Sequence, residues 1–208
     1  MPTEQSKRRQ RRSNGELSRL RILDAATEIA AERGYEGTSI GAVSAKCGLP
    51  ASSIYWHFKD KDDLLAAVVE RSFANWSAAW DLPEDGAIGD RIVTVAAQTA
   101  KALQNSPDFL RLGLMLALER RPVEPRARAM FMQVRQRAAL EIRKNIRVLA
   151  PELCDAQVHQ LATYAIAGAD GLFIASDVDG DSMDMLAMFV LHGQAVHAMM
   201  SKMIAETD

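Results

Sequence analysis

The chain of 208 residues is long enough to bury a substantial core in one or two domains, and its 48% apolar and 25% charged content is ordinary for a globular protein. Its net charge of −2 conceals an asymmetry. Residues 1–61 hold 11 Lys and Arg against 7 Asp and Glu, whereas the remaining residues hold 14 against 20. The first part therefore suits a polyanionic partner, and the rest does not.

The composition also indicates where in the cell the protein is located. The two cysteines, Cys47 and Cys154, exclude a disulfide framework and favour a reducing environment. The N-terminus is too charged for a signal peptide. The longest uncharged run, 185–201, contains two histidines and a glutamine and is shorter than the roughly 20 apolar residues of a membrane span. We therefore expect a cytoplasmic protein with no membrane partner.

Residues 1–14 are polar and contain a dense basic run. Their apolar content is too low to order the backbone alone. One interpretation is a solvated, flexible tail, and the other is a basic arm that lies along DNA phosphates or enters a minor groove. The basic residues of this arm are Lys7, Arg8, Arg9, Arg11 and Arg12.

An amphipathic helix is predicted over 16–33. One stripe is apolar or small, and Gly34 closes the helix. The stripe consists of Leu20, Leu23, Ala26, Thr27 and Ala30. Such a helix can pack across the segment that follows it.

The segment 38–61 reads as a helix-turn-helix. Thr38 is a natural N-cap for a helix over 39–46, and Gly48 can end that helix in the left-handed conformation. Pro50 suits the first turn of a second helix over 51–58, which places Ile54 and Phe58 on one face. Two short helices joined through a glycine form this motif. The rest of the second helix is rich in hydroxyls, rings and imidazole, as a groove-reading helix requires. After it, Asp60 is predicted to cap the next helix.

The prolines beyond position 50 separate further helical segments. No stretch shows the alternation of a strand, so the chain is predicted to be all-α, with about nine helices. The expected downstream helices are 62–80, 87–104, 107–120, 124–149, 155–176 and 182–205.

The last two helices are apolar around most of their circumference, which requires partners on more than one side. We expect a symmetric dimer interface there; the alternative is the central core of one subunit. The interface residues are predicted to be Ala165, Ala169, Leu172, Phe189, Val196 and Met200.

A ligand pocket is a second hypothesis for the C-terminal part, beside plain core packing. Three aromatic residues lie on one side of the helix after the helix-turn-helix, and a methionine-rich apolar cavity adapts to hydrophobic ligands. The pocket residues are predicted to be Phe73, Trp76, Trp80, Met115, Leu116, Phe131, Tyr164 and Phe173.

Catalytic and metal sites have little support in the sequence. Asp177, Asp179, Asp181 and Asp184 lack the glutamate that closes a calcium loop, and they suit helix termination instead. No nucleophile–base pair or phosphate loop is visible. We expect no enzyme activity, no metal site and no cofactor.

The run from Ile22 to Leu65, with ILDAATEIAAERGYEGTSI and IYWHFKDKDDLL around the predicted motif, resembles the DNA-binding domain of the tetracycline-repressor (TetR) family. The resemblance covers about a fifth of the chain. The glycine turn, the Tyr-aromatic-His-Phe run and Lys-x-Lys occur together at the family's spacing. It implies an N-terminal three-helix DNA-binding domain over 15–61 and a helical ligand-binding and dimerisation domain over 62–208.

The resemblance also implies residue roles. Thr38 and Ser39 would contact the DNA backbone from the start of the second helix. Base edges would face Ala51, Ser52, Ser53 and Tyr55, and phosphates would be held by Tyr55, Trp56, His57 and Lys61. Because Ala51 to Ser53 are short, DNA shape and the basic arm are expected to contribute to specificity.

The expected function is therefore that of a homodimeric transcriptional repressor. It would bind a palindromic operator in double-stranded DNA and be released by a small, largely apolar effector. The alternative is a helical small-molecule carrier or enzyme with a vestigial helix-turn-helix.

Overall fold

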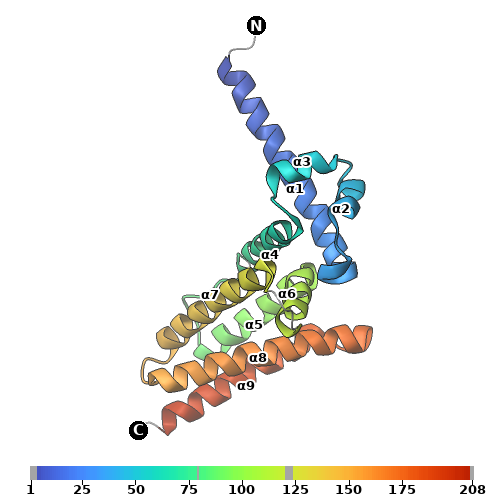
Figure 1. Cartoon of the computed structure of the whole chain (residues 1–208). Coiled ribbons are helices and arrows are strands. Elements are labelled where there is room, and N and C mark those ends of the chain that lie inside the picture. The colour runs from blue at the N-terminus through green and yellow to red at the C-terminus, as the bar shows by residue number, and fades with distance from the viewer. Residues whose placement is uncertain (1–3, 79, 120–123, 207–208) are drawn as a thin grey trace. The chain divides into compact units, whose positions relative to one another are not determined.

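The computed structural model describes residues 4–78, 80–119 and 124–206, with side chains from Asn14 onward. Within these ranges the chain forms nine α-helices, one short 3₁₀ helix and no strand, which confirms the predicted all-α fold (Figure 1). The helices are α1 (Glu4–Gly37), α2 (Ile40–Cys47), α3 (Ala51–His57), α4 (Lys61–Ser77), α5 (Ile88–Asn105), α6 (Asp108–Leu118), α7 (Arg126–Leu149), α8 (Asp155–Asp179) and α9 (Met185–Ala205).

The chain divides into two compact units. Unit 1 comprises Met1–Ser72 and Asp108–Met132, and unit 2 comprises Phe73–Pro107 and Gln133–Asp208. The sequence predicted a single boundary between residues 61 and 62. The observed division differs because α6 packs against α1, a contact between helices that are distant in the chain.

Helix α1 begins twelve residues earlier than the sequence suggested, at Glu4 rather than Glu16. From Glu4 onward the backbone of the predicted arm therefore continues the helix, and Figure 1 shows this part of α1 extending past α3. Lys, Arg, Gln and Glu are good helix formers, and no proline interrupts 4–33. The side chains of Lys7, Arg8, Arg9, Arg11 and Arg12 lie outside the described part of the chain.

Helix α1 is broken at Gly34, where the sequence predicted the helix to close, and a short helical segment continues to Gly37. The φ of Gly34, 66°, lies in the left-handed region that favours glycine. A Cβ at this position would lie 2.7 Å from the Cε atom of Met115 in α6. The break in the helix and the close approach of α6 therefore occur at the same residue.

The core of unit 1 is built from α1, α3, α4 and α6. Ile22 and Leu23 of α1, Ile54 of α3 and Leu64 of α4 have no exposed surface. At the other end of the unit, the Phe131 ring lies against Gly113 of α6 and 5.8 Å from the ring of Phe109. Because α6 also packs against α1, it belongs to the same unit as the helix-turn-helix.

Unit 2 is built around α5, α8 and α9. Gly193 of α9 lies so close to α5 that an added Cβ would be 3.0 Å from the Cβ of Ala96. Val196 and Met200 belong to a buried cluster with residues of α7 and α8, and Phe189 is also buried. The prediction that these three side chains form a dimer interface is therefore wrong, because α5 and α8 of the same chain cover them. Ala165, Ala169 and Leu172 are partly buried.

Candidate nucleic-acid interface

Helix α2 is capped by Ser39 and not by Thr38. The Ser39 Oγ accepts a hydrogen bond from the amide of Ala42 at 3.1 Å, and Ser39 is exposed. Thr38 is only 1% exposed, and its hydroxyl donates to the carbonyl of Gly34 at 2.8 Å. The predicted N-cap was therefore wrong by one residue, because the turn after Gly34 directs Thr38 inward. Of the two hydroxyls, only that of Ser39 is accessible to a phosphate.

The turn between α2 and α3 has the predicted geometry. Gly48 adopts φ 65° and ψ 24°, and its amide donates to Ser44 O at 3.0 Å. Arg21 of α1 donates to the carbonyl of Cys47 at 2.6 Å, at the negative end of α2. Pro50 is extended and starts α3. These contacts fix α2 and α3 on α1 as a helix-turn-helix.

Helix α3 is anchored on one side and presents the other to solvent. Ile54 and Phe58 are 0% and 3% exposed, whereas Tyr55 and Trp56 are 57% and 77% exposed. Ser52 is exposed, and Ala51 and Ser53 are partly buried. Two large aromatic side chains left in water on so short a helix indicate a binding surface.

Arg19 of α1 is a member of this surface that the sequence analysis missed. Its guanidinium carbon lies 5.4 Å from the centre of the Phe58 ring. Partial burial first, and the charge of Arg19 second, hold the pKa of His57 below its usual value of 6.5. These two effects favour the neutral form of His57, whose ring meets that of Trp56 edge-on at 4.7 Å. The packing of α1 across α3 brings Arg19 to the C-terminal end of α3.

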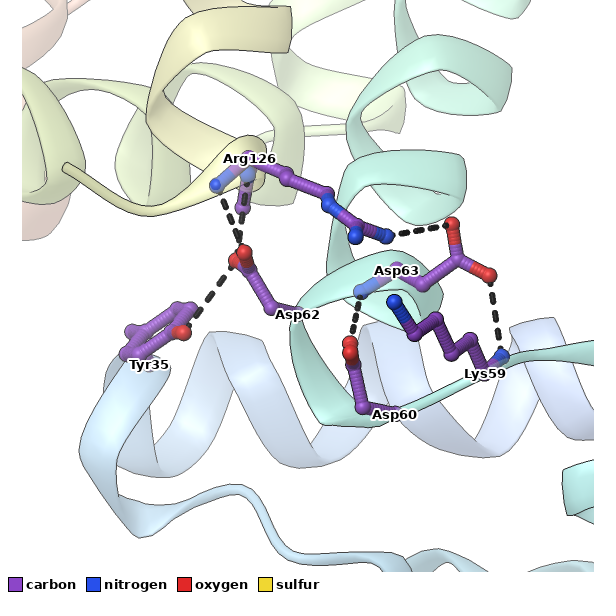
Figure 2. A network of polar contacts seen from close by, with 7 residues as sticks. Tyr35, Lys59, Asp60, Asp62, Asp63 and Arg126 are labelled. Carbon is purple, nitrogen blue, oxygen red and sulfur yellow. Dashed lines mark hydrogen bonds and ion pairs between the residues drawn. The ribbon is translucent and has the colours of Figure 1, made fainter.

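The start of α4 is held by a reciprocal pair of caps (Figure 2). Asp60 Oδ1 accepts from the amide of Asp63 at 2.8 Å, which confirms the predicted cap. Asp63 Oδ2 in turn accepts from the amide of Lys59 at 3.0 Å. Lys59 is exposed beside α3 and is a further candidate for a phosphate contact.

Lys61, which the family resemblance assigns to a phosphate, lies at the corner between α1 and α2. Its Nζ donates to the carbonyl of Tyr35 at 3.1 Å and lies 4.3 Å from the centre of the Tyr35 ring. Glu36 is 3.6 Å away. An ammonium carries three N–H donors, so these contacts orient Lys61 and leave it one donor for a phosphate.

The predicted pocket residues are divided between the two units. Leu116 and Phe131 are buried in unit 1, where Met115 is 45% exposed. In unit 2, the rings of Phe73 and Trp76 lie 5.9 Å apart and those of Trp76 and Trp80 lie 4.2 Å apart. Phe173 is buried, and Tyr164 is half-exposed with its ring 5.9 Å from that of His192. The structure thus brings together the three aromatic residues of the segment 73–80.

The segment that contains the helix-turn-helix is similar to known bacterial proteins. Residues 22–68 match the model of a family described as bacterial regulatory proteins, tetR family. The HTH-type transcriptional regulator AcrR of Shigella flexneri is 36% identical over 67 residues, which are 32% of this chain and 31% of that protein. An HTH-type transcriptional repressor of Mycobacterium tuberculosis is 29% identical over 110 residues, 53% of this chain and 42% of that protein. The chain thus spans less than half the length of these curated relatives.

The likeness of the fold extends further along the chain. The fatty acid degradation regulator FadR from Bacillus halodurans superposes with a TM-score of 0.72 over 86% of this chain and 93% of that one, at 14% identity. At that identity the likeness concerns the fold alone. The family model covers the helix-turn-helix and the matching relatives are named HTH-type transcriptional regulators, so residues 22–68 match the tetR family of bacterial regulatory proteins.

Proposed function

We propose that the protein is a homodimeric transcriptional repressor that binds a palindromic operator through α3 and is released by a small, largely apolar effector. The observation that carries the proposal is the surface of α3. Its apolar side chains Ile54 and Phe58 are buried, while Tyr55 and Trp56 remain in water beside an accessible Ser39. A helix held this way can enter a major groove and place its flanks on the phosphates.

The proposed contacts follow from exposure and charge. Ala51, Ser52, Ser53 and Tyr55 would face base edges, and the hydroxyl of Ser39 would bind the backbone. The phosphates would also be held by Trp56, His57, Lys61, Lys59 and Arg19. Because the pKa of His57 is lowered in the free protein, its ring is proposed to offer a hydrogen bond to the phosphate. The electrostatic part of the affinity for DNA would then come from the lysines and arginines, including those of residues 7–12.

The test of this function is the binding of DNA fragments taken from upstream of the gene that encodes the protein. Binding is measured by fluorescence anisotropy at two salt concentrations. We expect tight, sequence-selective binding that weakens steeply with salt. Tyr55→Ala should weaken it by about 1–3 kcal/mol without changing the helical circular dichroism spectrum, since the ring is mostly exposed. Equal affinity of the variant and wild type for every fragment contradicts the proposed docking face.

The homodimer is proposed from the exposed apolar side chains of α8 and α9. On α8, Ile174 and Val178 are 46% and 77% exposed, and on α9 Leu191 is 54% exposed. We call these three residues, with Met188 and Met199, the α8–α9 apolar face. Side chains of this kind remain in water only at a cost that a second subunit removes. The dimer would also supply the two recognition helices that a palindrome requires.

The effector site is proposed at the aromatic residues Phe73, Trp76 and Trp80. The indole nitrogen of Trp80 is buried and donates to no acceptor in the described part of the chain. A buried donor without an acceptor is costly, so a ligand with an apolar body and one acceptor atom fits this position. A thermal-shift screen of apolar metabolites and drugs tests the site, because a ligand that binds only the folded form raises the melting temperature. Trp80→Phe should lower the shift produced by any hit.

A cytoplasmic location is proposed with this function. By length and composition one helical stretch, Asp155–Ser182, could cross a membrane, with a mean hydropathy of 1.2 over its most apolar window. Within it, Asp170 forms a two-pronged ion pair with Arg135 of α7. Such a pair is expected of a helix that packs against protein. The proposed dimer accounts for the exposed apolar surface of α8 without a bilayer.

A further inference from the structure

The first turn of α7 is capped by a residue from another helix. Pro125 occupies the N-cap position, since its carbonyl accepts the first helical hydrogen bond, from Ala129 at 3.1 Å. Proline has no side-chain oxygen to bind the free amides that follow. The carboxylate of Asp62, in the first turn of α4, takes this place: it accepts from the amide of Arg126 at 2.6 Å and from that of Ala127 at 3.2 Å (Figure 2).

The same carboxylate also binds the corner of the helix-turn-helix. The hydroxyl of Tyr35 donates to Asp62 Oδ1 at 3.2 Å. Tyr35 is the residue whose carbonyl and ring hold the ammonium of Lys61. A side-chain ion pair between Arg126 and Asp63, at 3.6 Å, reinforces the link between α4 and α7. One carboxylate therefore connects the start of α7 to the residue that orients Lys61.

We infer that Asp62 and Tyr35 are positioning residues for DNA binding: they fix the Lys61 ammonium at the start of α4 and make its position depend on the first turn of α7. The inference rests on the proposed function, because it needs a phosphate for Lys61 to meet. Neither Asp62 nor the Tyr35 hydroxyl needs to touch DNA. Displacement of the start of α7 from α4 would break two hydrogen bonds to Asp62 and leave its carboxylate free to turn away from Tyr35.

Whether removal of a negative charge near Lys61 weakens or tightens DNA binding distinguishes a positioning role from a simple electrostatic one. Asp62→Asn and Glu36→Gln each remove one negative charge near Lys61, and on charge alone both should tighten DNA binding. Of these two carboxylates, that of Asp62 accepts hydrogen bonds from the amides that begin α7. We therefore expect Asp62→Asn to bind DNA about tenfold more weakly than wild type, whereas Glu36→Gln binds as tightly or more tightly.

Dependence on Lys61 is tested by a double-mutant cycle. Lys61→Gln should weaken binding and lower the slope of log affinity against log salt by about one. If Asp62 acts through Lys61, the double variant binds no more weakly than Lys61→Gln alone, and Asp62→Asn has a shallower salt slope than wild type. A merely structural role would leave that slope unchanged. Additive losses, or tighter binding by Asp62→Asn, overturn the inference.

A milder variant covers the case in which Asp62→Asn disturbs folding, which circular dichroism reveals. Tyr35→Phe removes one hydroxyl, with no change of charge and with the ring retained beside Lys61. We expect about threefold weaker binding, again absent in the Lys61→Gln background. Unchanged affinity of Tyr35→Phe counts against the proposed route.

A measurement without DNA separates this inference from the proposed function. Amide hydrogen exchange of Arg126 and Ala127 should accelerate in Asp62→Asn, while that of Ala187, which Asp184 caps at 2.9 Å in α9, stays constant. If wild type binds no DNA, the proposed function fails, and the exchange experiment still tests the link. Unchanged exchange at Arg126 and Ala127 overturns the link itself.

Discussion

At the scale of single residues, neighbouring side chains at the interface have opposite environments. Thr38 and Ser39 carry the same functional group, yet Thr38 is buried in the α1–α2 corner and Ser39 is free to bind a phosphate. Tyr55 and Trp56 are exposed, whereas His57 is partly covered and lies near the charge of Arg19. In the proposed complex, these differences decide which groups DNA could reach.

His57 gives a prediction about pH. Its pKa is lower in the folded protein than the usual 6.5, so the unfolded chain binds a proton more readily. The contribution of neutral His57 to stability is therefore complete above pH 6.5 and declines as the pH falls below it. His57→Gln should show a smaller loss of unfolding free energy than wild type between pH 7.5 and 5, measured by denaturant titration.

All other side chains are the same in the two proteins, so their contributions cancel in that comparison. Identical pH dependence of the two proteins would show that His57 is not held in its neutral form. Loss of the edge-on contact with Trp56 is expected to lower stability at both pH values equally, so only the difference between the two pH values is diagnostic.

At the scale of elements, helix ends are set by short-range chemistry. Asp60 caps α4, Gly48 ends α2, and Pro50 starts α3, each at the position that the sequence predicts. The start of α7 is different, because Pro125 cannot cap it and Asp62 supplies the acceptor from another helix. The residues near the start of α7 in the sequence therefore predict where this helix begins. They do not explain what stabilises its first turn.

The glycines of unit 1 provide a matched test at this scale. Gly34→Ala places a side chain at φ 66° and brings its Cβ to 2.7 Å from Met115, so we expect a loss of about 1–2 kcal/mol. Gly41, within α2, has a helical φ and an open position beside it, and Gly41→Ala should gain up to about 1 kcal/mol. Urea unfolding monitored by circular dichroism measures both. A gain for Gly34→Ala contradicts the structure of this corner.

At the scale of the whole molecule, the exposed apolar face of α8 and α9 has no partner in the described chain. The prediction of a dimer remains, but its residues change, since Phe189, Val196 and Met200 are core and Ile174, Val178 and Leu191 are exposed. The inner apolar stripe of α9 is covered within the subunit, so the outer stripe is the part that a second copy can contact. The helices α5 and α8 provide that cover for α9.

A single charge tests the dimer. Leu191→Glu buries a carboxylate in the proposed interface and should yield a monomer in size-exclusion chromatography with light scattering, together with loss of operator binding. Leu140 of α7 is similarly exposed, at 59% against 54%, and lies outside the α8–α9 apolar face, so Leu140→Glu should remain a dimer. A monomeric wild type, or a dimeric Leu191→Glu, contradicts the proposed interface.

The sequence by itself determined the helical class, the helix-turn-helix and most helix ends, because capping, glycine turns, prolines and apolar periodicity act over a few residues. The tertiary structure alone decided which apolar stripe of α9 faces inward and that α6 belongs to the same unit as the helix-turn-helix. It also decided that Arg19 lies against Phe58 and that Asp62 accepts from Arg126, in each case a residue far away in the chain. Those features depend on which helices pack together, and a periodic pattern names a buried face without naming the helix that covers it.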